Sequence, residues 1–116
     1  MLFRSASNDI TAFSSSDKNL KENIERITGA LDIVDAISGI RFDWNEKARE
    51  MYPERTQKDI GVIAQEVESV LPEIVTTRDN GYKAVKYEKM VAVLIEAIKE
   101  LKAEVDELKK KLGESS

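Results

Sequence analysis

Ser16 and Lys21 are the two residues of this chain whose types and spacing could support covalent chemistry. The chain has no histidine and no cysteine, so a serine nucleophile would have to use a lysine as its base. A lysine takes a hydroxyl proton near neutral pH when burial or neighbouring charge lowers the lysine pKa from about 10.4 toward about 7 to 8. The pair is therefore a candidate nucleophile and general base.

The same segment has a purely structural interpretation. Ser16, Asp17 or Asn19 can cap a helix, and Asn19 with Glu22 three residues later resembles a capping box. Under that interpretation Lys21 is a solvated surface charge. The serine-to-lysine spacing is common by chance, so the spacing alone favours the cap.

The composition of the chain excludes several classes of function. Of the 116 residues, 34% are charged and 41% are hydrophobic, as is usual for a single soluble domain. A formal net charge of −4 offers no basic surface to nucleic acid or to an anionic membrane. Without cysteine or histidine we expect no disulfide, no metal site and no cofactor. No apolar run approaches the roughly 20 residues that span a bilayer, so we expect a cytosolic chain.

Apolar residues recur at helical spacing over residues 19–38. This pattern predicts one helix, or two helices separated at Gly29, with Gly39 as the C-terminal stop. The apolar positions are Leu20, Ile24, Ile27, Leu31, Val34 and Ile37. Residues 1–15 show no sustained period and are interpreted as a lead-in from an upstream segment.

Ile40, Phe42 and Trp44 alternate with polar residues and predict a strand with one buried face. The polar stretch that follows, residues 45–58, is predicted to be a surface loop.

A second helix and a hairpin are predicted after a short apolar run. The helix covers residues 64–71 and ends before Pro72. An Asn-Gly pair lies within residues 78–81, and such a pair is a strong turn signal between two short strands. These strands are predicted at residues 74–77 and 82–85.

The last segment carries a heptad repeat over residues 87–112. Its apolar residues fall on alternating a and d positions, which predicts a coiled-coil helix that Gly113 ends. A helix of about 25 residues is about 37 Å long, so its distal half should project beyond the body and need partner chains. The expected seam residues are Val91, Leu94, Ile98, Leu101, Val105, Leu108 and Leu112.

Six sequence blocks occur in an order and spacing that resemble one family. They are SDKNLKENI at 16–24, ALDIV at 30–34, FDW at 42–44, IGVIAQEV at 60–67, LPEIV at 71–75 and VKY at 85–87. Together they resemble the C-terminal intramolecular chaperone domain of phage tailspikes and tail fibres, of the endosialidase type, which also occurs in myelin regulatory factor.

The resemblance implies a function for the candidate pair. The domain would form a homotrimer, guide the folding of an upstream β-rich fibre of the same polypeptide, and then cut itself off at the junction of Ser16 and Asp17. Ser16 would be the nucleophile and Lys21 its activating base. The domain would act in the host cytoplasm during virion assembly and would be absent from the mature fibre after cleavage.

The resemblance also implies an α+β fold and a division of the chain. Residues 1–15 would end the upstream fibre, and residues 16–86 would form a small globular chaperone part of helices and short strands. Residues 87–112 would form the C-terminal coiled-coil helix of a trimer, followed by a tail at residues 113–116. The partners implied are two further copies and the upstream fibre domain, with no nucleic acid and no membrane.

The chemistry of cleavage does not determine which peptide bond breaks. A serine oxygen that attacks its own carbonyl forms a strained four-membered ring, so Ser16 does not easily cut the bond to Asp17. A neighbouring chain could supply the serine, the serine could act through water, or the bond between Ser15 and Ser16 could break through a five-membered ring.

Two further alternatives concern assembly and function. β-Branched residues at a with leucine at d favour two-stranded coils, whereas the resemblance implies three strands, and we follow the resemblance because the fibre can impose a three-fold axis. A trimerisation module that never cuts itself is the alternative function, with the Ser16 segment acting only as a cap.

Overall fold

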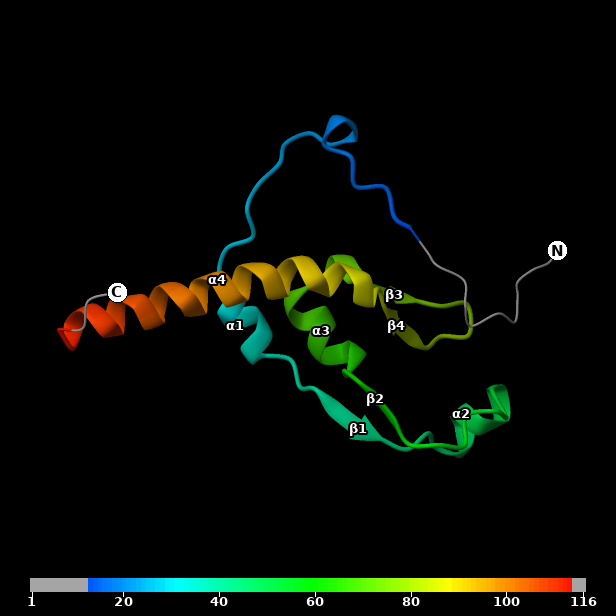
Figure 1. Ribbon diagram of the computed structural model, residues 1–116. Helices are drawn as coiled ribbons and strands as arrows, with labels where there is room; N and C mark the ends of the chain where they lie inside the picture. The colour runs from blue at the N-terminus through cyan, green and yellow to red at the C-terminus, as the bar shows by residue number, and fades with distance from the viewer. Residues whose placement is uncertain (1–12, 114–116) are drawn as a thin grey trace.

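The computed structural model describes residues 13–113 as an assembly of short helices and short strands that leads into one long C-terminal helix (Figure 1). This mixture confirms the predicted fold class of the single chain. Predictions for residues 1–12 and 114–116 lie outside the described residues. The elements are η1 (Lys18–Leu20), α1 (Ala30–Asp35), β1 (Ile40–Phe42), α2 (Glu46–Met51), β2 (Asp59–Gly61), α3 (Ala64–Val70), η2 (Pro72–Ile74), β3 (Val75–Thr77), β4 (Lys83–Val85) and α4 (Tyr87–Lys111).

One face of the first half of α4 carries the hydrophobic core. Val93 and Ala97 are buried on this face, and α1 and η2 pack against α4. Helix α3 completes the core through Val67, which is fully buried. Within residues 13–113 the buried apolar residues are Ala30, Val67, Leu71, Ile74, Val93 and Ala97. So small a core stabilises only the elements that touch it.

Two separate antiparallel ribbons extend from this core. In the first, Ile40 of β1 lies opposite Gly61 of β2. The second is the predicted hairpin of β3 and β4, in which the amide of Arg78 donates to the carbonyl of Tyr82 at 2.9 Å. Gly81 has a φ of 88°, a left-handed value that glycine adopts without strain. The hairpin prediction is confirmed, and the predicted strand after residue 39 ends at Phe42.

Tyr87 joins the first ribbon to the start of α4. The amide of Val62 donates to the Tyr87 hydroxyl at 3.3 Å. A Cβ atom on Gly61 would lie 2.8 Å from this hydroxyl oxygen and 3.4 Å from the ring of Phe42. Residue 61 must therefore lack a side chain for β2 to approach α4 this closely.

The prediction that residues 45–58 form a loop is wrong, because the segment contains α2. The Asn45 side chain accepts a hydrogen bond from the amide of Ala48 at 3.0 Å and caps the helix. The guanidinium of Arg55 then lies 4.3 Å from the ring centre of Trp44 and 4.2 Å from that of Tyr52. Capping and these cation–π contacts stabilise a short helix that has no apolar periodicity to reveal it.

The helix predicted before Gly29 is also wrong. This segment contains only the three-residue turn η1, and Asn23 adopts a left-handed φ of 53°. Leu20 and Ile24 are 76% and 69% exposed, so no packed face stabilises a helix here. The helix after Gly29 exists as α1 but ends at Asp35, ahead of the predicted stop at residue 39.

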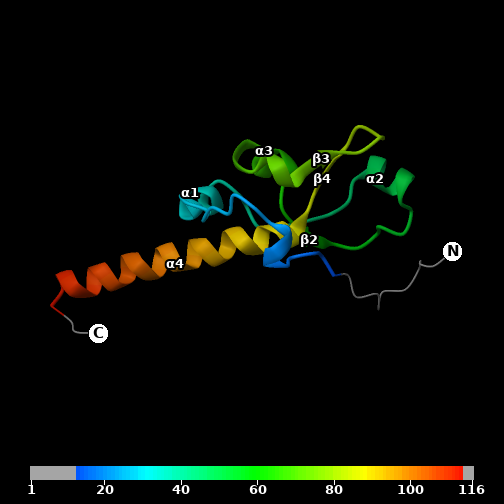
Figure 2. The same ribbon diagram turned by 90° about the horizontal axis from the view of Figure 1, so that it is seen from above.

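The molecule is elongated because α4 continues past the core (Figures 1 and 2). Its radius of gyration is 18.9 Å, against about 13 Å for a compact domain of 100 residues. Val105 and Leu108 on the projecting part are 41% and 58% exposed. Between residues 13 and 113 no helix is both long and apolar enough to cross a membrane.

Val67 provides a test of this core. Val67→Ala should lower the free energy of unfolding by about 2 kcal/mol, because it leaves a cavity among fully packed side chains. Ile60→Ala is the matched control and should change it by less than about 0.5 kcal/mol, since the Ile60 side chain is largely exposed. Urea unfolding at one fixed protein concentration measures both, and equal losses would contradict the described core.

Candidate functional site

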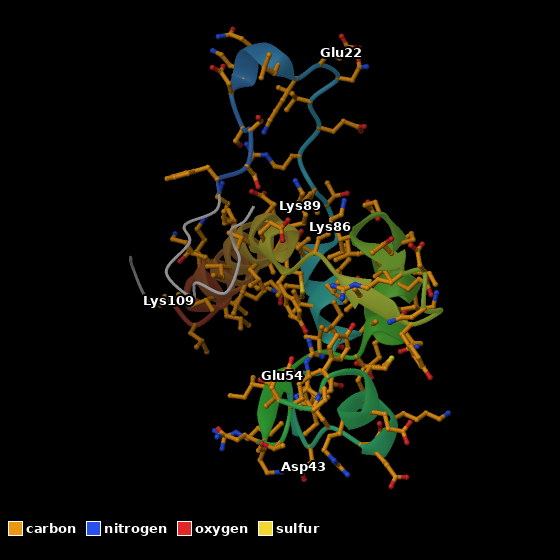
Figure 3. All side chains as sticks on the ribbon, turned by 90° about the vertical axis from the view of Figure 1, so that its right-hand side faces the viewer. Glu22, Asp43, Glu54, Lys86, Lys89 and Lys109 are labelled. Atoms are coloured by element: carbon orange, nitrogen blue, oxygen red, sulfur yellow. The ribbon has the colours of Figure 1, made fainter. Side chains whose placement is uncertain are left out.

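The candidate nucleophile and base lie on a segment that leaves the body of the protein. We call residues 13–29 the arm. Apart from Ile27, its residues are exposed. Figure 1 shows the arm on one side of α4, with α3 and the first ribbon on the other. Figure 3 gives the same arrangement from the side, with Glu22 of the arm at one end and Asp43 and Glu54 at the other.

A single tight turn brings Ser16 and Lys21 together. Asp17 adopts an extended conformation, and its carboxylate accepts a hydrogen bond from the amide of Asn19 at 2.9 Å. The amide of Lys21 donates to the carbonyl of Lys18 at 3.2 Å and closes the turn. Lys21 Nζ then donates to Ser16 Oγ at 3.0 Å. Of the three candidate caps, Asp17 is the cap observed, and it coexists with the serine–lysine contact.

The contact has the distance that proton transfer requires. In this hydrogen bond the Lys21 ammonium group donates to the Ser16 hydroxyl. Catalysis requires the reverse, in which a neutral lysine amine accepts the proton of the hydroxyl. A buried amine loses its proton more readily than a solvated one. Both side chains are exposed in the single chain. The turn therefore aligns the pair, and activation needs a further surface to cover it.

The base of the arm is attached to α4 by the carboxylate of Glu100. Its two oxygens accept hydrogen bonds from the amides of Ala30 and Leu31 at 2.9 and 3.0 Å. Gly29 precedes α1 with a left-handed φ of 67° and has no side chain to cap the helix. One turn earlier on α4, Glu96 lies 3.6 Å from the Arg26 guanidinium.

These hydrogen bonds lower the pKa of the Glu100 carboxyl. The amide of Leu31 has the largest effect and that of Ala30 the next, while partial desolvation acts in the opposite direction. Sequence reasoning missed this residue, because the carboxylate and the amides it caps are 70 positions apart. The one available signal was Gly29, because a helix that follows a glycine has no capping side chain at that position and needs a cap from elsewhere.

The most distinctive sequence block, residues 60–67, has a structural role. Gly61 allows the close approach of Tyr87, and Val67 fills the core. Glu66 accepts a hydrogen bond from the amide of Ser38 at 2.9 Å and fixes the link between α1 and β1 to α3. The block therefore specifies the fold on which the arm is mounted.

Outside the arm, two further features bear on possible chemistry: metal-binding clusters and hollows. Across residues 13–113 no three histidine, cysteine, aspartate or glutamate side chains lie together in a way that could hold a metal ion. A hollow of about 650 Å³ lies between the two ribbons and includes Trp44, Tyr52 and Tyr82 in its lining. Ser16 and Lys21 do not line it.

Comparison with known proteins identifies the family. The family model described as "Chaperone of endosialidase" matches residues 16–76, which is more than half of the chain. The chain belongs to this family. The match begins at the candidate nucleophile, Ser16.

Curated relatives are long tail fiber proteins of phages. The chain is 37% identical over 101 residues to the long tail fiber protein Gp37 of Enterobacteria phage K3, a match that covers 84% of this chain and 8% of the relative. It is 36% identical over 107 residues to Gp37 of Salmonella phage S16, covering 86% of this chain and 14% of the relative. The chain thus spans only a small part of the length of these relatives.

Acid should remove the Glu100 cap in a defined range of pH. The hydrogen bonds hold the folded-state pKa of Glu100 below its ordinary value of 4.5, so the cap contributes fully to stability above that value and is lost as the pH falls through the lower, folded-state pKa. An NMR titration should show the amides of Ala30 and Leu31 shifting together with the Glu100 carboxyl, with a midpoint below 4.5.

The control for this titration is Glu100→Gln. Because a glutamine side chain does not titrate, the low-pH shift of both amides should disappear in this variant. A midpoint at or above 4.5 in the unaltered protein would contradict the capping geometry.

Proposed function

We propose that this chain is an intramolecular chaperone that trimerises, directs the folding of an upstream phage tail fibre, and then releases itself by autoproteolysis with Ser16 and Lys21. The observation that carries the proposal is the hydrogen bond between Lys21 Nζ and Ser16 Oγ, at the residue where the family match begins. The similarity to long tail fiber proteins supports a fibre as the upstream client.

The exposed seam of α4 supports self-association. Its apolar residues form one continuous stripe that nothing in the single chain covers, and an uncovered stripe of this size indicates an interface. In a coiled-coil trimer, the seams of three copies would meet on a common axis. The exposed seam residues are Val91, Leu94, Ile98, Leu101, Val105, Leu108 and Leu112.

Such a trimer would lower the entropic barrier to fibre folding. Intertwined β-structures have high contact order, so loop closure and chain association must be overcome before native contacts form. Three chains held in register have a high effective concentration for one another. Removing the assembling domain afterwards would prevent reversal along the same path and give the fibre kinetic stability.

The cleavage step follows from the serine–lysine contact once neighbouring subunits cover the arm. Ser16 Oγ transfers its proton to the neutral Nζ of Lys21 and bonds to the carbonyl carbon of the scissile peptide. The C–N bond breaks, the leaving nitrogen takes the proton from Nζ, and an ester on Ser16 remains. Water hydrolyses the ester and leaves a carboxylate on the upstream fragment.

Two bonds are accessible to this chemistry. When Ser16 of a neighbouring copy attacks, the bond between Ser16 and Asp17 breaks. When Ser16 attacks its own preceding carbonyl through a five-membered ring, the bond between Ser15 and Ser16 breaks. In both cases the domain separates in the host cytoplasm during virion assembly, and the mature fibre ends at or just before residue 16.

A trimerisation module without cleavage is the second candidate. The Asp17 cap favours it, because this cap alone explains the turn at residues 17–21. The exposure of Ser16 and Lys21 in the single chain favours it as well. The two candidates differ in whether the chain stays intact after the fibre has folded.

The seam can be tested with charges. Ile98→Asp together with Leu101→Asp should weaken the trimer by about 3 kcal/mol or more, because both carboxylates would be buried without partners. Ala103→Asp is the matched control, since this exposed residue lies on the opposite face of the same helical turns. Sedimentation velocity should detect monomers in the first variant and trimers in the second. Trimers in both would contradict the proposed seam.

The dyad can be tested by intact mass, in a chain that carries its folded upstream fibre segment. Ser16→Ala and Lys21→Ala should each slow cleavage by at least about 100-fold and leave the trimer intact. Lys21→Arg should do the same, because arginine keeps the charge but does not act as a base. Lys18→Ala is the matched control and should cleave normally.

The masses also identify the broken bond, since the two possible cuts differ by one serine residue. Cleavage that persists in Ser16→Ala would contradict the assigned nucleophile. A single full-length mass from every variant, including the unaltered trimer, would leave the trimerisation module as the function.

A further inference from the structure

We propose that Glu100 is a positioning residue for autoproteolysis: its carboxylate fixes the base of the arm on α4, and thereby presents Ser16 and Lys21 to a neighbouring subunit at a defined height along the trimer axis. This inference rests on the proposed function and adds to it a residue outside the dyad. It also assigns a role to the two hydrogen bonds that join the start of α1 to the helix that carries the seam.

The first step of the argument is that α1 depends on Glu100. A helix leaves its first amides without partners, and α1 has only six residues to compensate. Gly29 supplies no capping side chain. The Glu100 carboxylate accepts from the amides of both Ala30 and Leu31, and hydrogen bonds to a charged acceptor are stronger than neutral ones. The start of α1 is thus held by α4 rather than by its own sequence.

The second step is the place of Glu100 on α4. In the heptad it occupies position c, between Ile98 at a and Leu101 at d. The anchor therefore lies on the same helical turns as the seam, on a face that α1 covers. Because the helix is rigid over this distance, registering the seams of three copies also registers the three points where the arms begin.

The third step is the length of free chain. Lys21 precedes Ala30 by nine residues, a reach of at most about 30 Å. If α1 is released, the next fixed point is Ser38, whose amide donates to the Glu66 carboxylate, so the free chain lengthens to 17 residues. Effective concentration falls as about the −3/2 power of tether length, so this release alone dilutes the dyad roughly threefold. Loss of orientation at the neighbouring surface slows the reaction further.

The experiment measures cleavage rates of trimers that carry the upstream fibre segment. Glu100→Gln should slow cleavage by about threefold to tenfold without lowering the trimer fraction. Glu100→Asp keeps the charge but shortens the reach by one methylene, so its rate should be intermediate. Glu107→Gln, at position c one heptad after Glu100, is the matched control and should cleave at the unaltered rate, because the exposed Glu107 side chain lies beyond the turns of α4 that meet the arm.

An insertion distinguishes positioning from a loss of stability. Two residues, Gly-Ser, placed between Asn23 and Ile24 leave the dyad and the anchor intact but lengthen the arm. They should slow cleavage in the unaltered chain and have a smaller effect in the Glu100→Gln background, where the arm is already released. Additive effects, or a Glu100→Gln rate equal to the unaltered rate, would overturn the proposal.

A second readout does not depend on cleavage. The chain contains no cysteine, so spin labels at Asn19→Cys and Lys110→Cys report only the distance from the arm to α4. Trimers with one labelled chain among unlabelled ones should give a narrow distance distribution that Glu100→Gln broadens. If the unaltered trimer never cleaves, the proposed function fails, but the distance measurement still tests the role of Glu100. Distance distributions of equal width in the unaltered protein and in Glu100→Gln would overturn the positioning role.

Discussion

Packing on one face of the first half of α4 is the constraint on which the rest of the structure depends. Val93 and Ala97 are buried there against α1 and η2, and α3 closes the same core through Val67. Both ribbons start from this small core, and the arm begins at α1 on its edge. Because the core uses only one face of α4, the seam remains exposed along the helix. One element therefore both holds the core together and leaves an apolar stripe exposed.

The sequence predicted the elements whose signals are local and periodic, namely the hairpin, α3 and the long helix. It failed where the apolar pattern of a segment does not reflect the contacts that the segment makes. Leu20 and Ile24 have helical spacing, but no surface covers them, and the segment stays irregular. Helix α2 forms without an apolar pattern, because a cap and stacking of Arg55 on two aromatic rings support it. Periodicity shows what a segment could bury, whereas tertiary contacts decide whether it does.

The candidate site also has a part that the sequence predicted and a part that it did not. The contact between Ser16 and Lys21 spans five positions and forms within a single turn, so sequence alone could bring the pair together. The environment that would activate the pair does not come from this turn, because both side chains face solvent. Glu100, which holds the arm's base, was out of reach of a local pattern. Sequence thus located the candidate pair but not the interactions that hold the base of its arm.

The turn at residues 17–21 also gives the arm a mechanical property. Ser16 and Lys21 are in contact at 3.0 Å only while the chain between them is folded into η1, since five extended residues would separate them by up to about 17 Å. A pull on the upstream chain acts on this turn before it reaches the two hydrogen bonds at Glu100. The contact between Ser16 and Lys21 therefore depends on tension in the chain. It forms when the upstream chain carries no tension and is lost when that chain is pulled.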